Sequence, residues 1–332
     1  MEFEISAGVK YRLRGLHGYE GKKSVHQIVQ SCKLELPLSV MFRNNDLLER
    51  VKLIDKIKEG DKVTINLGYN DKNVKEFEGY IKRINPKIPL ELEIEDSMYL
   101  LRKIRLNKNF KKAQVREVLQ YITDELHVQQ GVRFVLQPIE QMPAMEVYNF
   151  FMREGCDGIA ALQALQDVTV VLQCYLTEIK GVKTLYCGFM YGLKKQTIKY
   201  VFNRNTISLD ELKYNQPAIR SFRVEVRVVN SAGKVKKYQF FDKHGEFKRY
   251  EMQGDYSEES VKKYAEGRLQ WLQAVGYKGA FTTFLIPSVE PGDIGACTDN
   301  QFRDRSGDYY ISSVTTTFGS GGRRKPEIEI RL

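Results

Sequence analysis

The sequence predicts a β-rich α+β protein in which two similar β units flank a small α+β unit. Near each end of the chain a Gly-Asp turn leads into a strand, a polar loop and a return strand that carries an aromatic residue next to Ile. Runs with strict apolar and polar alternation, typical of half-buried strands, accompany both copies. Stretches with helical spacing lie between the copies. We expect units at residues 1–105, 106–216 and 217–332, the last with a long helix.

The first β unit is predicted from Glu59–Val63, which contains the turn, and from the return strand Phe77–Ile81. An Asp after Gly most often fixes a turn through hydrogen bonds from its side chain to the backbone. Residues Leu90–Glu95 alternate strictly and predict a strand. The carboxylates expected on its solvated face are Glu91, Glu93 and Glu95.

The middle unit is predicted to contain two helices and a pair of strands. Apolar residues at helical spacing predict a helix that begins near Phe110 and ends before Gly131. Asp157 is the expected N-cap of a shorter helix that reaches Asp167. A strand at Thr184–Phe189 then pairs with the apolar segment before it.

The second β unit repeats the opening pattern. Phe222–Val228 alternates apolar and charged residues, and a long helix with Ser257 as N-cap is expected to stop at Gly276. Pro291–Ile294 then leads to Tyr309–Ile311 as in the first copy. The residues expected to form the two structural turns are Gly60, Asp61, Gly292 and Asp293.

The glycine-rich segment Gly319–Lys325 has the composition of an anion-binding loop. It lies between two strand-like runs, and no helix follows whose N-terminus could hold phosphate. We therefore predict a flexible hairpin tip with a basic end.

The composition is that of an ordinary globular protein, with 42% hydrophobic and 28% charged residues. No apolar run approaches the roughly 18 residues of a spanning helix, and the N-terminus lacks the pattern of a signal peptide. We expect a soluble protein made without a classical export signal. The cysteines are 5 in number and form no C-x-x-C pair, which favours thiols in a reducing compartment over disulfides or a zinc site.

The formal net charge is +10, and one stretch of the sequence is basic without any acidic residue. Such a stretch could follow phosphates, line a pore or meet an acidic protein, and the alternative is a solvated face. The residues predicted to face an anion or a partner are Arg102, Lys103, Arg105, Lys108, Lys111 and Lys112, and the stretch continues to Arg116.

The sequence contains no pattern that indicates catalysis. Metalloprotease, nucleophile-elbow, P-loop and dinucleotide-binding motifs are absent, and the 4 histidines stand alone. No catalytic, cofactor-binding or metal-binding residue is predicted, and we expect no cofactor and no enzymatic activity. A glycosidase acid pair would need two carboxylates that nothing here selects.

Taken in order, these features resemble the hub proteins of contractile phage tails. The resemblance includes late control protein D and the hub portion of type VI secretion valine-glycine-repeat spike proteins, and it spans nearly the whole chain. The segments that carry it are Gly60–Tyr69, Phe77–Ile81, Ile94–Asp96, Pro287–Asp293 and Gly307–Phe318.

The resemblance implies a structural protein of a virion, prophage, tailocin or secretion device. It implies that the two β units are barrel-like tube domains and that three chains form a ring, a homotrimer, which adapts a six-fold tail tube to a three-fold spike. The implied partners are the tail tube protein, a separate spike protein and baseplate proteins, with DNA passing through the channel. The implied location is the tail or baseplate, assembled in the bacterial cytoplasm. The chain carries no hydrolase insert, so any cell-wall hydrolase would be a separate chain.

Two other interpretations remain open at this point. A basic nucleic-acid-binding protein would bind through the stretch at 102–116 in a salt-dependent way without forming a ring. A tail-associated cell-wall hydrolase would degrade peptidoglycan.

Overall fold

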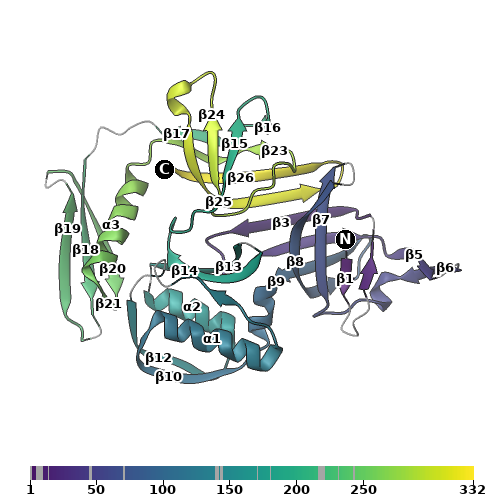
Figure 1. Ribbon diagram of the computed structural model, residues 1–332, viewed down its shortest axis with the longest axis horizontal. Helices are drawn as coiled ribbons and strands as arrows, with labels where there is room; N and C mark the ends of the chain where they lie inside the picture. Colours follow the sequence, from purple (N-terminus) through teal and green to yellow (C-terminus); the bar gives the residue numbers. More distant parts are fainter. Residues whose placement is uncertain are drawn as a thin grey trace.

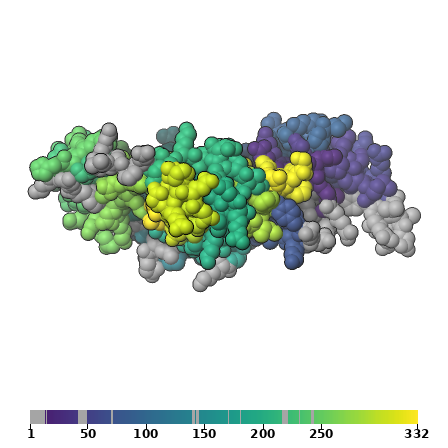
Figure 2. Space-filling model, turned by 90° about the horizontal axis from the view of Figure 1, so that it is seen from above, coloured from purple at the N-terminus to yellow at the C-terminus, as the bar shows by residue number. Residues whose placement is uncertain are grey.

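The computed structural model describes residues 2–4, 10–13, 15–44, 47–69, 72–138, 142, 145–169, 171–179, 181–215, 221–230, 232–241 and 244–332. The fold is β-rich α+β, as the sequence predicts, with one broad sheet beside two smaller helix-bearing regions (Figure 1). The molecule is elongated, with the first β unit at one end and residues around 222–260 at the other (Figure 2).

The first β unit is an antiparallel sheet in the order β3-β4-β9-β8-β7-β1-β2. Its apolar face is formed by alternate residues of the strands, because side chains on a strand point to opposite faces in turn. Leu34, Ile65 and Leu92 are fully buried there. The bounds are β1 Glu2–Glu4, β2 Lys10–Arg12, β3 Gly18–Ser24, β4 Ser31–Leu36, β7 Lys62–Tyr69, β8 Lys72–Asn85 and β9 Leu90–Asp96, with a separate hairpin of β5 Ser39–Asn44 and β6 Leu47–Lys52, and 3₁₀ turns η1 Leu53–Asp55 and η2 Ser97–Arg102.

Strand β9 confirms the predicted alternation with one exception. Leu90, Leu92 and Ile94 are buried, while Glu91 and Glu93 are half-buried. Glu95 was expected in solvent and is instead 4% exposed. Arg102 Nε and Lys82 Nζ lie 2.8 Å and 2.6 Å from its carboxylate, and these side chains cover it.

The second β unit has the strand order β24-β25-β26-β22-β17, with β15 parallel to β24 and β23 between β26 and β16. Tyr200, Phe281 and Tyr309 form its core. The bounds are β15 Thr197–Val201, β16 Thr206–Ser208, β17 Leu212–Asn215, β22 Gly276–Ala280, β23 Thr282–Thr283, β24 Ile294–Thr298, β25 Gly307–Phe318 and β26 Gly322–Arg331, with a 3₁₀ turn η4 at Arg303–Arg305.

The two β units are joined into one sheet of 15 strands through β25 and β3. These strands pair antiparallel from Ser313 opposite Ser24 to Phe318 opposite Tyr19. Among the described residues the sheet stays open, and neither unit closes into a barrel of its own.

The middle region packs two helices against short sheets. Helix α1 begins at Val115 rather than near Phe110, because the preceding residues pair with β12 in strand β10. Gly131 ends the helix with a φ of 68°, as predicted. Asp157 caps α2 by accepting a hydrogen bond from the Ala160 amide at 2.8 Å. The bounds are β10 Leu106–Gln114, α1 Val115–Gln130, β11 Val135–Leu136, β12 Met145–Cys156, α2 Gly158–Thr169, β13 Leu172–Ile179 and β14 Val182–Phe189.

A third region follows the middle one and shares its core. Ser257 caps helix α3 by accepting a hydrogen bond from the Ser260 amide at 3.2 Å, as predicted. Val224, Val261 and Tyr264 belong to the same apolar cluster as α1 and α2. The bounds are β18 Phe222–Val229, β19 Val235–Phe241, β20 Glu246–Gln253, β21 Asp255–Tyr256 and α3 Glu258–Leu272.

The packing crosses the expected unit limits in two places. Strands β15 to β17 lie within 106–216 but pair with strands of 217–332, and α3 lies within 217–332 but packs in the core of the middle region. The limit at 216 falls outside the described residues. The three ranges therefore stay a prediction.

The 5 cysteines are free thiols. Cys174 and Cys187 lie opposite each other on β13 and β14, with their Sγ atoms 2.8 Å apart. In the described part of the chain no helix is both long and apolar enough to cross a membrane.

Candidate assembly interface

The two Gly-Asp turns make the same set of backbone hydrogen bonds. In the first, the Gly60 amide donates to the Ile81 carbonyl at 2.7 Å, and the Ile81 amide donates to the Asp61 carbonyl at 2.9 Å. In the second, Gly292 donates to Ile311 at 2.8 Å, and Ile311 donates to Asp293 at 3.0 Å. The glycine φ angles are 91° and 89°, a region that favours glycine.

The aspartate side chains also act alike. Asp61 Oδ2 accepts the Lys58 amide at 2.9 Å, and Asp293 Oδ2 accepts the Glu290 amide at 2.8 Å. Both aspartates are buried, with 1% and 0% exposure. In both copies the aspartate side chain thus accepts a backbone amide within the turn, and the role of the four residues as turn formers stays a prediction. Burial raises the pKa of Asp293 above its ordinary value, although its hydrogen bonds to Glu290 and Gln196 oppose the rise.

The strands that follow the turns match in register. Lys62 and Ile294 lie opposite Tyr80 and Tyr310 at the start of β7 and β24. An irregularity then follows Ile81 in β8 and Ile311 in β25, and β25 has a further one between Tyr310 and Ile311. After it, Arg83 lies opposite Glu93 in the first unit, as Ser313 lies opposite Glu327 in the second. Strands β7, β8 and β9 therefore correspond to β24, β25 and β26.

The tyrosine on the return strand of each unit, Tyr80 or Tyr310, packs against an aromatic residue outside its own hairpin. Tyr80 stacks on Tyr99 of η2 with ring centroids 5.7 Å apart. Tyr310 meets Tyr191 edge-on at 5.1 Å and is 1% exposed. Both tyrosines contribute to packing within the chain.

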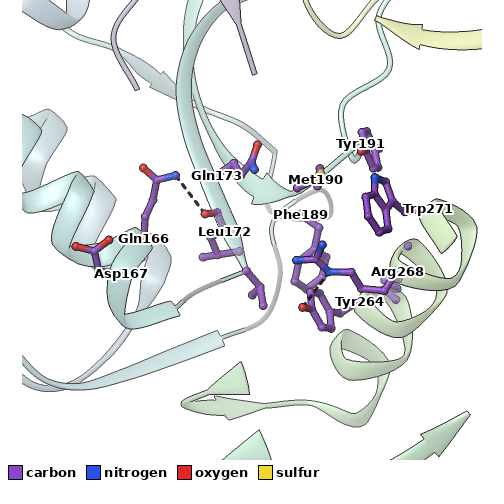
Figure 3. A pocket seen from close by; sticks show the side chains of 13 residues that line it. Gln166, Asp167, Leu172, Gln173, Phe189, Met190, Tyr191, Tyr264, Arg268 and Trp271 are labelled. Carbon is purple, nitrogen blue, oxygen red and sulfur yellow. Dashed lines mark hydrogen bonds between the residues drawn. The ribbon is translucent and has the colours of Figure 1, made fainter. Parts of the chain in front are cut away.

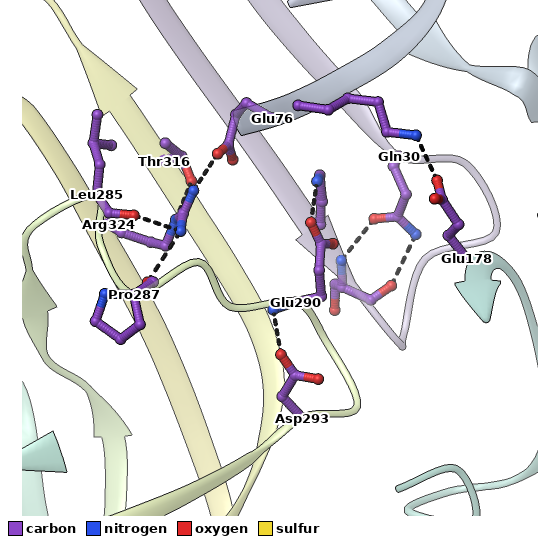
Figure 4. A network of polar contacts seen from close by, with 12 residues as sticks. Gln30, Glu76, Glu178, Leu285, Pro287, Glu290, Asp293, Thr316 and Arg324 are labelled. Atoms are coloured by element: carbon purple, nitrogen blue, oxygen red, sulfur yellow. Dashed lines mark hydrogen bonds and ion pairs between the residues drawn. The ribbon is translucent and has the colours of Figure 1, made fainter. Parts of the chain in front are cut away.

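The contact between the β units contains a buried ion pair (Figure 4). Arg324 of β26 is 1% exposed and pairs with Glu76 of β8. Its Nη1 also donates to the carbonyl oxygens of Leu285 at 2.7 Å and Pro287 at 3.2 Å. A buried charge needs such partners, because losing water costs several kcal/mol per ion.

The predicted hairpin at Gly319–Lys325 is present, with Phe318 opposite Gly322, but its basic residues do not lie at the tip. Strand β26 already begins at Gly322, so the basic residues belong to the sheet. The signal was present in the sequence, because Arg324 continues the period-two series of Pro326, Ile328 and Ile330 on one face of the strand.

A polar cavity of about 320 Å³ lies where both β units meet the β13–β14 hairpin. Lys23 and Glu290 form an ion pair across the units at 2.6 Å, and Lys183 pairs with Glu78 at 2.6 Å. Burial raises the pKa of Glu290, but Lys23 and Lys195 outweigh it and hold the pKa below its ordinary value. Burial raises the pKa of Asp96 to about 7. The cavity thus holds paired charges that join the three regions.

A second cleft of about 430 Å³ separates β13 and β14 from α3 (Figure 3). Phe189, Tyr264 and Trp271 supply aromatic surface, and Trp271 is 40% exposed. Arg268 Nε donates to Tyr264 Oη at 3.0 Å. Within the described residues no group of three or more His, Cys, Asp or Glu side chains is arranged to hold a metal ion.

The basic stretch does not form one uniform charged face. Arg102 pairs with Glu95 at 2.8 Å, and Lys112 pairs with Glu146 at 3.1 Å. The Lys108 ammonium lies 4.5 Å from the centre of the Tyr121 ring, an attractive arrangement. Two others also have contacts within the chain, since Lys103 lies over Tyr99 and Arg105 donates to the Arg102 carbonyl oxygen. Lys111 is exposed. That this stretch faces an anion or a partner stays a prediction.

The fold is similar to that of solved tail proteins. The tail protein of Neisseria meningitidis MC58 matches with a TM-score of 0.60 at 13% identity, over 99% of this chain and 95% of that one. The 43 kDa tail protein of prophage MuSo2 from Shewanella oneidensis matches with 0.58 at 12%, over 99% and 100%. The c3393 protein of Escherichia coli, a type VI secretion component with structural similarity to the phage T4 tail proteins gp27 and gp5, matches with 0.58 at 11%, over 97% and 76%.

These matches confirm the resemblance at the level of the fold. No protein-family model matches the sequence, and no curated protein matches it by sequence comparison. At 11–13% identity the structural likeness describes the fold alone.

Proposed function

We propose that this protein is the structural hub of a phage tail or of a related contractile injection device. Three chains form a ring that adapts a six-fold tail tube to a three-fold spike, and the role is mechanical rather than catalytic. Each β unit serves as one tube domain.

The observation that carries the proposal is the equivalence of the two turns and of the strands that follow them. Gly60 and Gly292 make matching hydrogen bonds, and the strand pairs share register and the irregularity after Ile81 and Ile311. A ring of three chains with two equivalent units each presents six similar positions to a tube and three identical ones to a spike. Such a ring is a closed head-to-tail assembly, in which one surface of a chain meets a different surface of the next.

The fold comparisons support the same proposal. Two of the similar structures are described as tail proteins and one as a type VI secretion component. The proposed partners are accordingly a tail tube protein, a separate spike protein and baseplate proteins. The proposed location is the tail or baseplate, after assembly in the bacterial cytoplasm. The ring would enclose a channel for DNA, and the basic stretch stays a predicted contact for DNA or a partner protein.

The proposal is tested by measuring the mass of the purified chain in solution by light scattering over a range of concentrations. We expect an assembly of three chains of 38.5 kDa each as concentration rises. A monodisperse monomer at the highest concentration, alone and with the candidate spike protein, would overturn the proposal. The same sample incubated with peptidoglycan is expected to release no fragments.

A further inference from the structure

The long strand β25 has most of its outer edge, the one away from β26, covered by two partner strands. Strand β24 pairs with its first part, from Gly307 to Tyr310. Strand β3 of the first unit pairs with its second part, from Ser313 to Phe318. The junction between the units of one chain is therefore a strand pair formed on the second part of β25.

The corresponding strand of the first unit, β8, lacks the second partner. Strand β7 covers its outer edge only as far as Tyr80. By the shared register, Arg83, Ile84 and Asn85 correspond to Ser313, Val314 and Thr315. In the part of the chain that the structure describes, these three residues pair with β9 on one side and with no strand on the other.

Burial shows the same difference between the two edges. Ser313 and Val314 are 3% and 2% exposed under the junction. Arg83 is exposed and Ile84 is half-buried. An open strand edge of this kind is a template for pairing with another chain.

The strand that corresponds to β3 is β17. In the first unit β9 pairs with β4 and β4 pairs with β3, and in the second unit β26 pairs with β22 and β22 pairs with β17. The register carries across these ladders and places Leu212–Asn215 at the positions of Gly21–Ser24. The outer edge of β3 is covered by β25, whereas β17 has β22 as its one strand partner among the described residues.

We infer that β17 of a second copy of this chain pairs antiparallel with the open edge of β8, as β3 pairs with β25 inside the chain. This inference rests on the proposed ring and names the contact that closes it. The junction within the chain supplies the register. Arg83 lies opposite Asn215 of the partner subunit, Ile84 opposite Tyr214 of the partner subunit, and Asn85 opposite Lys213 of the partner subunit.

The side chains at these positions suit the pairing. The two basic residues, Arg83 and Lys213, each face an amide side chain, so no like charges are directly opposed. Ile84 faces Tyr214, and pairs of an aromatic and a β-branched residue stabilise neighbouring strands. The lengths also agree, because Pro86 lacks an amide hydrogen and ends the edge of β8, while β17 has 4 residues.

A pair of cysteines tests this register directly. Residues opposed in an antiparallel pair have Cα atoms about 4.5–5.5 Å apart, which a disulfide can span. The first variant carries Arg83→Cys and Asn215→Cys together in a Cys156→Ser background. After mild oxidation, a non-reducing denaturing gel is expected to show bands of two and three linked chains in place of the single-chain band. Asn85→Cys with Lys213→Cys is a second in-register pair and should behave alike.

Two control pairs make the result specific. The variant with Glu20→Cys and Thr317→Cys places two exposed cysteines opposite each other within one chain. Its two introduced thiols should be consumed by a disulfide within the chain, and the chain should stay in the single-chain band. Arg83→Cys with Lys213→Cys is out of register by two residues and should remain mostly a single-chain band.

The outcomes separate this inference from the proposed function. One outcome overturns the strand pairing and leaves the ring. In it, light scattering gives a three-chain mass and the Glu20 and Thr317 pair forms its disulfide, but neither in-register pair links. Equal linking of the out-of-register pair also overturns the strand pairing. A single-chain mass at every concentration overturns the ring and the inference together.

Discussion

The two β units of this chain have the same backbone plan but different neighbours. Both contain a Gly-Asp turn held by equivalent hydrogen bonds, and both have an irregularity after the following Ile. The second unit has β3 along its long strand β25, whereas β8 of the first unit ends with an edge that no strand of the described residues covers. The two units therefore share the backbone hydrogen bonds of their turns, and they differ in the strands that lie beside them.

Side chains at matching positions have diverged. Arg324 of β26 corresponds to Leu90 of β9, and both are buried. Asp96 of β9 lies opposite Gly79, as Arg331 of β26 lies opposite Tyr309. The ion pair of Arg324 with Glu76 therefore has no counterpart in the first unit, because Leu90 holds the position of Arg324.

The largest effect is expected from Arg324→Met, which leaves Glu76 buried without its partner. Breaking a buried ion pair on one side costs about 3–5 kcal/mol in the free energy of unfolding. Urea denaturation followed by far-ultraviolet circular dichroism measures the loss. The double variant Glu76→Gln with Arg324→Met should recover much of it.

The neighbouring Lys325 gives a matched control. It pairs with Glu211, whose side chain is 61% exposed, and such surface pairs contribute about 0–1 kcal/mol. Lys325→Met should therefore change stability little. Equal losses in Arg324→Met and Lys325→Met would contradict the role of the buried pair in joining the units.

The next largest effect is a pH dependence at Asp96, whose position in the second unit is held by Arg331. The pKa of Asp96 is raised to about 7 by burial, against about 3.9 in an unfolded chain. A carboxyl with a raised pKa favours the folded state most below the unfolded pKa, and this stability is lost as pH rises from about 4 through about 7. Asp96→Asn keeps a side-chain oxygen that can accept the Met98 amide and removes the titration.

Unfolding measured from pH 4 to pH 8 should therefore show a fall in wild-type stability, relative to Asp96→Asn, of about 2–4 kcal/mol. His26, whose pKa is raised by its hydrogen bond to Glu329, contributes with the same sign in both proteins and cancels in the difference. A difference that is flat across this range would show that Asp96 is ionised in the folded state.

A smaller and symmetric effect is expected at the turn glycines. Gly60→Ala and Gly292→Ala each place a Cβ at a positive φ, which costs about 1–3 kcal/mol. Gly267→Ala in α3 is the control, because its Cβ would meet no atom within 4 Å and alanine favours a helix by about 1 kcal/mol. Thermal unfolding should show the two turn variants destabilised alike and the helix variant stabilised. Clearly unequal losses at the turns would break the equivalence.

The smallest effect is expected at the turn aspartates. Asp61→Ala and Asp293→Ala each remove one side-chain acceptor of a backbone amide, worth about 1 kcal/mol. Asp293→Ala also removes the acceptor of Gln196 Nε2 at 3.1 Å. Urea denaturation measures the free energy of unfolding of both variants. If neither variant is less stable than the wild type, the side chains do not stabilise the turns.

The sequence predicts those features that local hydrogen bonding and periodicity determine. The two Gly-Asp turns, the caps at Asp157 and Ser257 and the alternation in β9 as far as Ile94 depend on residues close together in the chain, and the structure contains them. Of these features, the two Gly-Asp turns also carried the resemblance to tail hub proteins.

What could not be predicted depends on partners far apart in sequence. Helix α1 begins later than expected because Leu106–Gln114 pairs with β12. Arg324 is buried because Glu76, on the other β unit, reaches it. The pairing of β25 with β3 follows no local pattern either, since alternation shows which face of a strand is apolar and not which strand lies beside it.

In the proposed ring of three chains the two β units occupy equivalent positions. End-on images of the purified assembly by negative-stain electron microscopy, averaged and analysed for rotational symmetry, test it most directly. The account predicts a ring with a central channel, three-fold symmetry and a strong additional six-fold component. A ring without the six-fold component, or particles that form no ring, would contradict it.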